Sequence, residues 1–130
     1  MNGAFGYELD LSKLDEAELE EMKRQVEFYK RNRELVMTGD FYRLLSPFTT
    51  RYSAWMYVSE DKSRTLVYYV VRKARVFNET IYLKLKGLEE NTQYSVDGKI
   101  KSGRTLMNYG ILLDTPERDG DNMILEIKKI

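Results

Sequence analysis

The chain has 130 residues, of which 42% are hydrophobic and 32% charged, with 21 Lys and Arg against 21 Asp and Glu. This composition predicts one compact folded domain, too short for an α/β barrel, and the balanced charge argues against nucleic acid as a partner. The absence of His and Cys excludes Ser-His or Cys-His nucleophile pairs, Cys/His zinc sites and disulfides.

The N-terminal residues 1–11 contain neither the basic region nor the apolar region of a secretory signal peptide. No apolar run elsewhere approaches the length of a membrane span, so we expect no membrane partner. A chain without cysteine is compatible with a reducing compartment, and we therefore expect a cytoplasmic location.

A long helix is predicted at residues 16–38. Asp15 can cap its start, Glu18 completes a capping box, and Leu14 and Leu19 flank these residues as a hydrophobic staple. Apolar residues recur at three- and four-residue steps and form one stripe that should face a partner surface: Leu19, Met22, Val26, Tyr29 and Val36.

Gly39 is expected to stop this helix and can adopt the left-handed conformation. From residue 40 onward, short β-branched and aromatic runs alternate with turn-forming clusters, which is typical of an all-β sandwich. Asp97-Gly98 fits the positive φ angles of a type I′ hairpin turn. The sequence therefore predicts one long N-terminal α-helix followed by an antiparallel β-sandwich of about eight strands, at residues 41–45, 54–58, 65–75, 80–86, 94–96, 99–101, 111–114 and 123–130.

The carboxylates could serve a glycosidase only if two of them faced each other across a cleft, with one kept protonated by its surroundings. The 21 acids lie mostly on predicted helix faces and in turns, where a solvated surface residue is the ordinary interpretation. We therefore nominate no catalytic residue, no metal ligand and no cofactor-binding residue.

The segment 117–122 carries acids at alternate positions, as calcium-binding loops sometimes do. Its Gly120 separates two of the acids, unlike in an EF-hand, and Arg118 adds an opposing charge. A plain turn is favoured because Gly, Asp and Asn form turns for backbone reasons. Asn78-Glu79-Thr80 matches the N-glycosylation acceptor pattern and is interpreted as a turn before a strand.

Aromatic residues could form a platform on which sugar rings stack. Trp55 and Tyr57 lie on one face of a predicted strand, which is either core or platform. The run 66–71 is apolar on both faces, as in a strand buried on both sides. We favour core packing for these aromatic residues.

The order of motifs resembles the end of the α-galactosidases of glycoside hydrolase family 36. Five runs follow the pattern of that family in order and at its spacing: FGYELDL at 5–11, FYKRNRELV at 28–36, GDFYRLLSPF at 39–48, AWMYVSEDKS at 54–63 and SGRTLMNYGILL at 102–113. The similarity covers essentially the whole chain.

The resemblance implies that residues 1–39 are the lead-in and last helix of a parent (β/α)8 barrel, and that residues 40–130 are its C-terminal antiparallel sandwich. In this family, two aspartates of the barrel release terminal α-linked galactose from melibiose or raffinose-type sugars. Both aspartates would lie upstream of this sequence, so no catalytic residue can be placed on it. The expected role of the chain is structural, its expected partner is the barrel of the same parent, and galactosides would bind only at the active site of the parent.

Two other functions stay open at this point. One is an independent carbohydrate-binding module that uses Trp55 and Tyr57, and the other is a small self-sufficient glycosidase that uses its own carboxylates. A chain without the rest of the barrel would also leave the apolar stripe of its helix uncovered. We therefore expect self-association through the helix at 16–38, and an oligomer.

Overall fold

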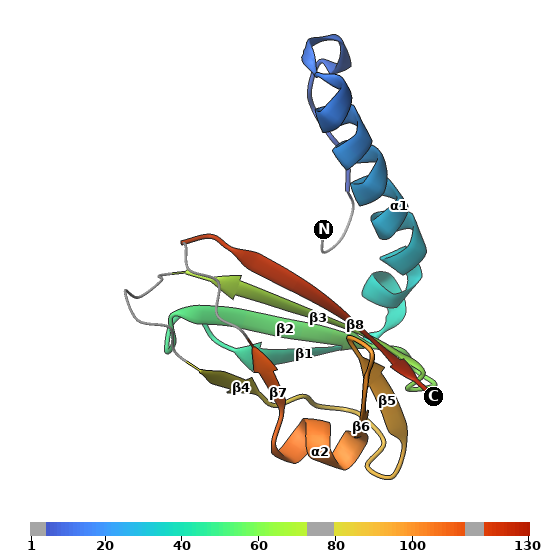
Figure 1. Cartoon of the computed structure of the whole chain (residues 1–130), viewed down its shortest axis with the longest axis vertical. Coiled ribbons are helices and arrows are strands. Elements are labelled where there is room, and N and C mark those ends of the chain that lie inside the picture. The colour runs from blue at the N-terminus through green and yellow to red at the C-terminus, as the bar shows by residue number, and fades with distance from the viewer. Residues whose placement is uncertain (1–4, 73–79, 114–118) are drawn as a thin grey trace. The chain divides into compact units, whose positions relative to one another are not determined.

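A computed structural model describes residues 5–72, 80–113 and 119–130 of the chain (Figure 1). The chain forms two compact units, one that ends at Thr38 and one that begins at Gly39. Its length suggests a single compact domain, whereas the N-terminal helix with its lead-in makes a unit of its own.

The first unit is built around α1, which spans Glu16–Thr38 as predicted, after a short 3-10 turn at Leu11–Lys13. The predicted capping box is present. The Asp15 side chain accepts a hydrogen bond from the Glu18 backbone N–H at 2.8 Å, and the Glu18 side chain accepts one from the Asp15 backbone N–H at 3.0 Å. These bonds satisfy N–H groups that would otherwise lack a partner in the first turn.

The end of α1 differs from the prediction in its backbone conformation. The helix stops at Thr38, directly before Gly39. Among the described glycines, however, those with a positive φ are Gly87, Gly98, Gly110 and Gly120. Gly39 does not need the left-handed conformation, because the chain passes directly into β1, Asp40–Leu45, whose backbone is extended.

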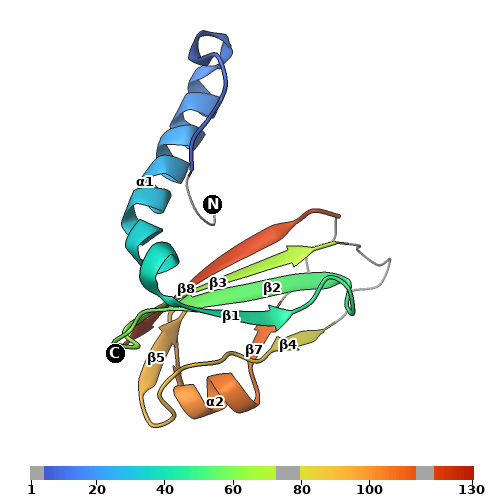
Figure 2. The same cartoon turned by 180° about the vertical axis from the view of Figure 1, so that it is seen from behind.

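The lead-in of the first unit lies alongside α1 (Figures 1 and 2). The ring of Phe5 lies 5.2 Å from that of Tyr29, and the Tyr7 hydroxyl donates a hydrogen bond to the Gln25 side-chain oxygen. The lead-in thus contacts the predicted apolar stripe, whose members are all half-buried.

The most buried side chains of α1 are Asn32 and Leu35, which are 2% and 5% exposed and are not members of that stripe. With Phe28 they recur at four- and three-residue steps, so they share one face of the helix. The Asn32 side-chain amide donates to the Phe28 carbonyl oxygen at 3.0 Å. The buried face in the second half of α1 is therefore displaced from the predicted one, because an Asn there interrupts the apolar pattern.

The second unit contains eight strands: β1 Asp40–Leu45, β2 Tyr52–Val58, β3 Arg64–Val71, β4 Ile81–Leu83, β5 Gln93–Val96, β6 Lys99–Ser102, β7 Ile111–Leu113 and β8 Asn122–Lys129. Six of them form one sheet in the order β1-β2-β3-β8-β5-β6, and β4 pairs with β7 in a second sheet. All of these pairs are antiparallel. The predicted mainly antiparallel fold of about eight strands behind one N-terminal helix is confirmed.

The hydrophobic core lies between the large sheet on one side and β4, β7 and the short helix α2 (Gly103–Asn108) on the other (Figure 2). The large sheet contributes alternate residues of its strands, and the smaller layer contributes mainly leucines. Full burial of each aliphatic side chain stabilises the fold by roughly 1.5–3 kcal/mol. The best-buried members are Ala54, Met56, Val58, Val67, Tyr69, Val71, Leu83, Leu85, Tyr94, Leu106, Leu113 and Ile127.

The structure corrects two parts of the strand prediction. The predicted strand at 80–86 pairs only over Ile81–Leu83, and α2 was not predicted. Leu83 and Leu85 are both buried in the core and show the alternation of a strand, although the Leu85 N–H donates to the carbonyl oxygen of Leu106 in α2 and not to a strand. Alternation alone cannot distinguish these cases. The last predicted residues of the strands at 65–75 and 111–114 lie outside the described residues.

The β5–β6 hairpin has the predicted turn. Asp97 and Gly98 have φ angles of 47° and 76°, and Val96 pairs with Lys99. Positive φ at both central positions is the mark of a type I′ turn. No helix in the described part of the chain is both long enough and apolar enough to cross a membrane.

Candidate functional site

A row of aromatic rings crosses the face of the large sheet that is turned away from the core. The Phe41 and Tyr57 rings are 5.4 Å apart, those of Tyr57 and Tyr68 are 6.1 Å apart, and those of Trp55 and Tyr68 are 5.4 Å apart. The register of the strands produces this row, since Phe41 lies opposite Tyr57 and Trp55 lies opposite Tyr68. The sequence correctly places Trp55 and Tyr57 on one face of β2.

Most of this row is covered by its own rings, which limits the surface that a sugar could reach. The Trp55 ring is stacked on Tyr68 with only 8° between the planes, so one of its faces is already covered. Tyr57 and Tyr68 are only 9% and 6% exposed. Burial raises the pKa of Tyr68 to about 12, and it also raises the pKa of Tyr57. Tyr57 and Tyr68 are thus buried, but among the rings of this outer face and not in the core cluster, which takes Ala54, Met56 and Val58 from β2.

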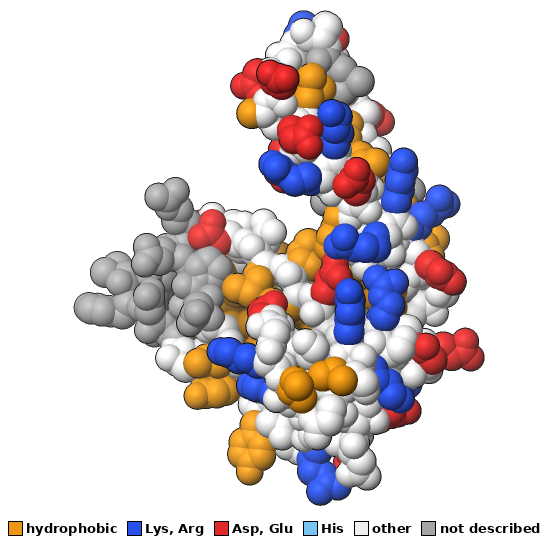
Figure 3. All heavy atoms as spheres, turned by 45° about the vertical axis from the view of Figure 1, so that its right-hand side comes forward, with side chains coloured by type: hydrophobic (Ala, Val, Ile, Leu, Met, Phe, Trp, Pro, Cys, Tyr) orange, Lys and Arg blue, Asp and Glu red, His pale blue; other side chains and the backbone are white. Residues whose placement is uncertain are grey.

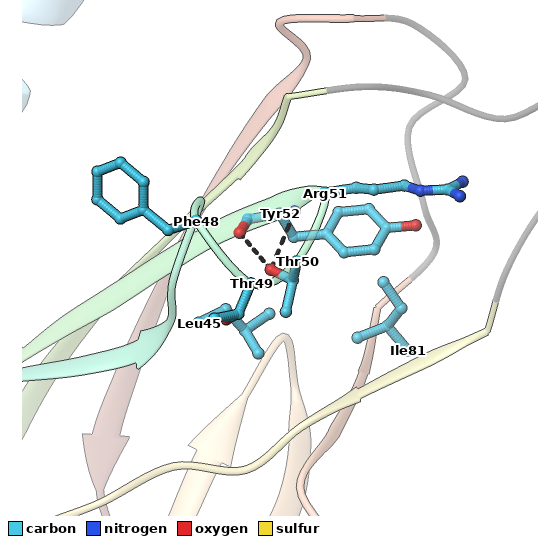
Figure 4. A pocket seen from close by; sticks show the side chains of 7 residues that line it. All are labelled: Leu45, Phe48, Thr49, Thr50, Arg51, Tyr52 and Ile81. Carbon is cyan, nitrogen blue, oxygen red and sulfur yellow. Dashed lines mark hydrogen bonds between the residues drawn. The ribbon is translucent and has the colours of Figure 1, made fainter.

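An open hollow of about 510 Å³ lies beside the turn between β1 and β2. Figure 4 shows the Phe48 ring pointing away from the other lining side chains, whereas Arg51 and Tyr52 extend in the opposite direction. Among the described residues that line the hollow there is no carboxylate, so it lacks the groups for acid–base chemistry on a glycosidic bond. The lining residues are Leu45, Phe48, Thr49, Thr50, Arg51, Tyr52 and Ile81.

Four described carboxyl groups lack the property that a general acid needs. A glycosidase needs one carboxyl group whose pKa is raised. In four described carboxyl groups the pKa is instead lowered, because each accepts hydrogen bonds from neighbouring side chains: Asp10, Glu21, Asp61 and Glu89. No group of three or more acids in the described residues is placed to hold a metal ion.

The described end of the acidic segment 117–122 is a turn. Gly120 has a φ of 85°, and its N–H donates to the Val71 carbonyl oxygen at 2.8 Å. The Val71 N–H donates in turn to the Asp121 carbonyl oxygen at 2.9 Å. The turn therefore accounts for a glycine at position 120, because its backbone has a positive φ there, and this agrees with the interpretation of the segment as a plain turn. Residues 117 and 118 lie outside the described residues, as do Asn78 and Glu79 of the glycosylation pattern.

Comparisons with known proteins divide the chain into two matched parts. Residues 1–39 match a family model described as Melibiase, and residues 52–126 match one described as the glycosyl hydrolase family 36 C-terminal domain. The second match covers more than half of the chain.

Curated relatives are much longer than this chain. Alpha-galactosidase AgaA of Geobacillus stearothermophilus is 45% identical over 131 residues, which cover 100% of this chain and 18% of the relative. The bifunctional alpha-galactosidase/sucrose kinase AgaSK of Mediterraneibacter gnavus is 37% identical over 115 residues, which cover 87% of this chain and 12% of the relative.

Solved structures agree with these matches. The family 36 α-galactosidase AgaB of Geobacillus stearothermophilus superposes with a TM-score of 0.92 at 44% identity, over 97% of this chain and 18% of its own. The α-galactosidase of Lactobacillus brevis superposes with a TM-score of 0.90 at 30% identity, over 96% of this chain and 18% of its own.

Proposed function

The chain belongs to glycosyl hydrolase family 36, and we propose that it forms the C-terminal part of an α-galactosidase. The complete enzyme would release terminal α-linked galactose from oligosaccharides such as melibiose and raffinose. Two similar solved structures support this substrate class, because they are AgaA variants in complex with raffinose and with stachyose. In this proposal the chain itself carries no catalytic residue, and galactosides bind only in the upstream part of the parent.

One observation carries the proposal. The match to the Melibiase family ends at residue 39, beside the boundary between the two units at Thr38 and Gly39, and the C-terminal domain match begins at residue 52. We infer that α1 with its lead-in closes the barrel of the parent and that the sandwich follows it.

The structural role can be tested on the full-length parent. We expect the parent to release galactose from raffinose, and we expect a version that ends at residue 39 to lose soluble expression or to melt at a lower temperature. The reason is that removal of the sandwich exposes whatever apolar surface it covers. A truncated parent with the melting temperature and turnover of the complete enzyme would contradict a structural role for the sandwich.

We further propose that the isolated chain associates with itself through α1. A hollow of about 450 Å³ between the lead-in and the helix is lined by Met22, Val26 and Tyr29 of the stripe. These side chains are half-buried, so apolar area is left that another apolar surface could cover. Light scattering at high protein concentration should show a mass above that of the 15.4 kDa chain. A monodisperse monomer would contradict self-association.

The absence of cysteine in the 130 residues supports a cytoplasmic location for the parent, which we include in the proposal. Fractionation of cells that express the parent would test it. Activity recovered only outside the cytoplasm would contradict this part of the proposal.

A further inference from the structure

The turn between β1 and β2 holds the most exposed large apolar side chain of the described residues. Phe48 is 90% exposed, more than any other large hydrophobic residue among them. It is one of the residues that line the hollow beside the turn, and its ring points away from the other lining side chains (Figure 4). A single exposed apolar residue is ordinary. An exposed ring on a hydrogen-bonded turn beside an apolar hollow is unusual and indicates a binding surface.

The turn is braced by several hydrogen bonds. The Ser46 carbonyl oxygen accepts from the backbone N–H groups of Thr49 and Thr50 at 3.3 and 3.0 Å, and its hydroxyl accepts from the N–H of Phe48 at 3.3 Å. The Arg72 guanidinium donates to the Pro47 carbonyl oxygen and so joins the turn to the residue after β3. The phenyl ring is therefore presented by a backbone that needs little further ordering when it binds.

One side of the hollow is formed by Tyr52, which packs against a core residue. The Tyr52 ring stacks on Tyr69 with centroids 5.5 Å apart, and Tyr69 is 1% exposed. The Thr50 hydroxyl donates to the Tyr52 carbonyl oxygen at 2.6 Å and accepts from its N–H at 3.2 Å. Leu45 and Ile81 complete the apolar lining, and Arg51 stands at its edge. An aromatic anchor, an apolar hollow and an arginine at the rim are the features of a binding hot spot.

We propose that this turn surface, made by Leu45, Phe48, Arg51, Tyr52 and Ile81, docks against the part of the parent chain that lies upstream of residue 1. The inference rests on the proposed function, because it needs the chain to be the C-terminal part of a longer enzyme. Phe48 enters an apolar pocket of the upstream part, and an apolar side chain of that part fills the hollow. An acidic residue of the upstream part meets Arg51.

Two facts favour the upstream part over a second copy of the chain. The chain spans 18% of AgaA, and its matched family is a C-terminal domain, so most of such a parent precedes it. The hollow is lined by only seven residues, whereas a stable interface between separate proteins uses about 20–30 residues on each side. A small surface is sufficient within one chain, because the linked parts are held at a high effective concentration.

The test measures thermal unfolding of Phe48→Ser in the full-length parent and in the 130-residue chain. We expect the melting temperature of the parent to fall by about 3 °C or more, and that of the chain to stay the same. Phe48→Leu should restore most of the loss. Ile100→Ser is the matched control, because Ile100 is 65% exposed on the edge strand β6 and should change neither protein.

Three results would overturn the docking proposal. The first is that Phe48→Ser leaves the melting temperature of the parent unchanged. The second is that Phe48→Ser lowers the melting temperatures of the parent and of the chain equally, which would mean that the ring acts inside the sandwich. The third is that Phe48→Ser lowers the mass of the chain measured by light scattering, which would make a second copy the partner. The α-galactosidase activity of the wild-type parent is measured separately, so a failure of the proposed function is distinguishable from a failure of docking.

Discussion

The side chain of Asp61 organises the turn between β2 and β3. It accepts hydrogen bonds from the Ser59 hydroxyl at 2.6 Å, from the Ser63 backbone N–H at 3.0 Å and from the Ser63 hydroxyl at 2.7 Å. These bonds lower the pKa of Asp61 from 3.8 to about 2, because they stabilise the charged carboxylate. Lys62 in the same turn has a φ of 57° and binds Asp40 at 2.8 Å, so the turn is joined to the start of β1.

This geometry predicts an acid-sensitive contribution to stability. A carboxylate whose pKa is lower in the folded state stabilises the fold above its unfolded pKa of 3.8, and this contribution is lost as pH falls toward about 2. The difference in free energy of unfolding between wild type and Asp61→Asn should therefore be constant above about pH 5 and shrink below pH 4. Urea unfolding at a series of pH values measures it.

Carboxyl titration by NMR gives an independent check on Asp61. Ser63→Ala removes one donor and should raise the pKa of Asp61 toward its ordinary value, whereas the backbone N–H bond remains. If Asp61 titrates near 3.8 in the wild-type chain, the hydrogen bonds seen in the turn do not persist in solution.

Trp55 provides a direct test of the carbohydrate-binding alternative, because it is the only tryptophan of the chain. Its ring is stacked on Tyr68, so no free face is left on that side for a sugar. Addition of raffinose or galactose should leave the emission spectrum of Trp55 unchanged, and unfolding in urea provides the control for a responsive signal. A saturable shift of the emission on addition of sugar would support the alternative that the chain is a carbohydrate-binding module.

At the level of elements, α2 depends on a glycine at its first position. A Cβ atom on Gly103 would lie 2.0 Å from the Glu89 carbonyl oxygen, and both are backbone positions with little freedom to move. The Gly103 N–H also donates to the Thr92 carbonyl oxygen at 2.9 Å. The close approach joins α2 to the loop before β5 and helps to bury Leu106, which is 0% exposed.

We predict that Gly103→Ala destabilises the chain by about 3 kcal/mol, because the backbone must shift to admit the methyl group. Gly98→Ala is the matched control: it meets no atom within 4 Å, but its φ is +76°. The control substitution should lower the free energy of unfolding by about 1–2 kcal/mol, because alanine is strained in the left-handed conformation. Equal losses from the two substitutions in urea unfolding would mean that the approach to Glu89 is looser than the structure shows.

Local rules explain which elements could be predicted from the sequence. The start of α1 follows from Asp15 and Glu18, and the β5–β6 turn follows from Asp97-Gly98, because neighbouring residues determine these features. The burial of Leu35 and the formation of α2 depend on tertiary packing, which no local pattern encodes.

The candidate site shows the same division. Alternation places Trp55 and Tyr57 on one face, but the stacking partner of Trp55 is set by the register between β2 and β3. The exposure of Phe48 depends on how the turn after β1 projects from the sheet. From the sequence, Ser46-Pro47 predicts only the end of a strand.

At the level of the whole molecule, the chain is a small part of the enzymes that it matches. It spans 18% of AgaA, and the described residues that line the hollow beside β1 and β2 include no carboxylate. A retaining or inverting glycosidase needs one carboxylate and one protonated carboxyl group, at a separation of about 5–9.5 Å. The proposed function places such a pair in the upstream part of the parent and gives the sandwich a supporting role.

The most direct test is to assay hydrolysis of a chromogenic α-galactoside by the 130-residue chain beside the full-length parent. We predict activity in the parent and none in the chain, because the proposed function gives the chain a structural role without catalytic residues. Hydrolysis by the chain alone, retained through purification and absent from a mock preparation, would contradict this account and assign catalysis to its own carboxylates.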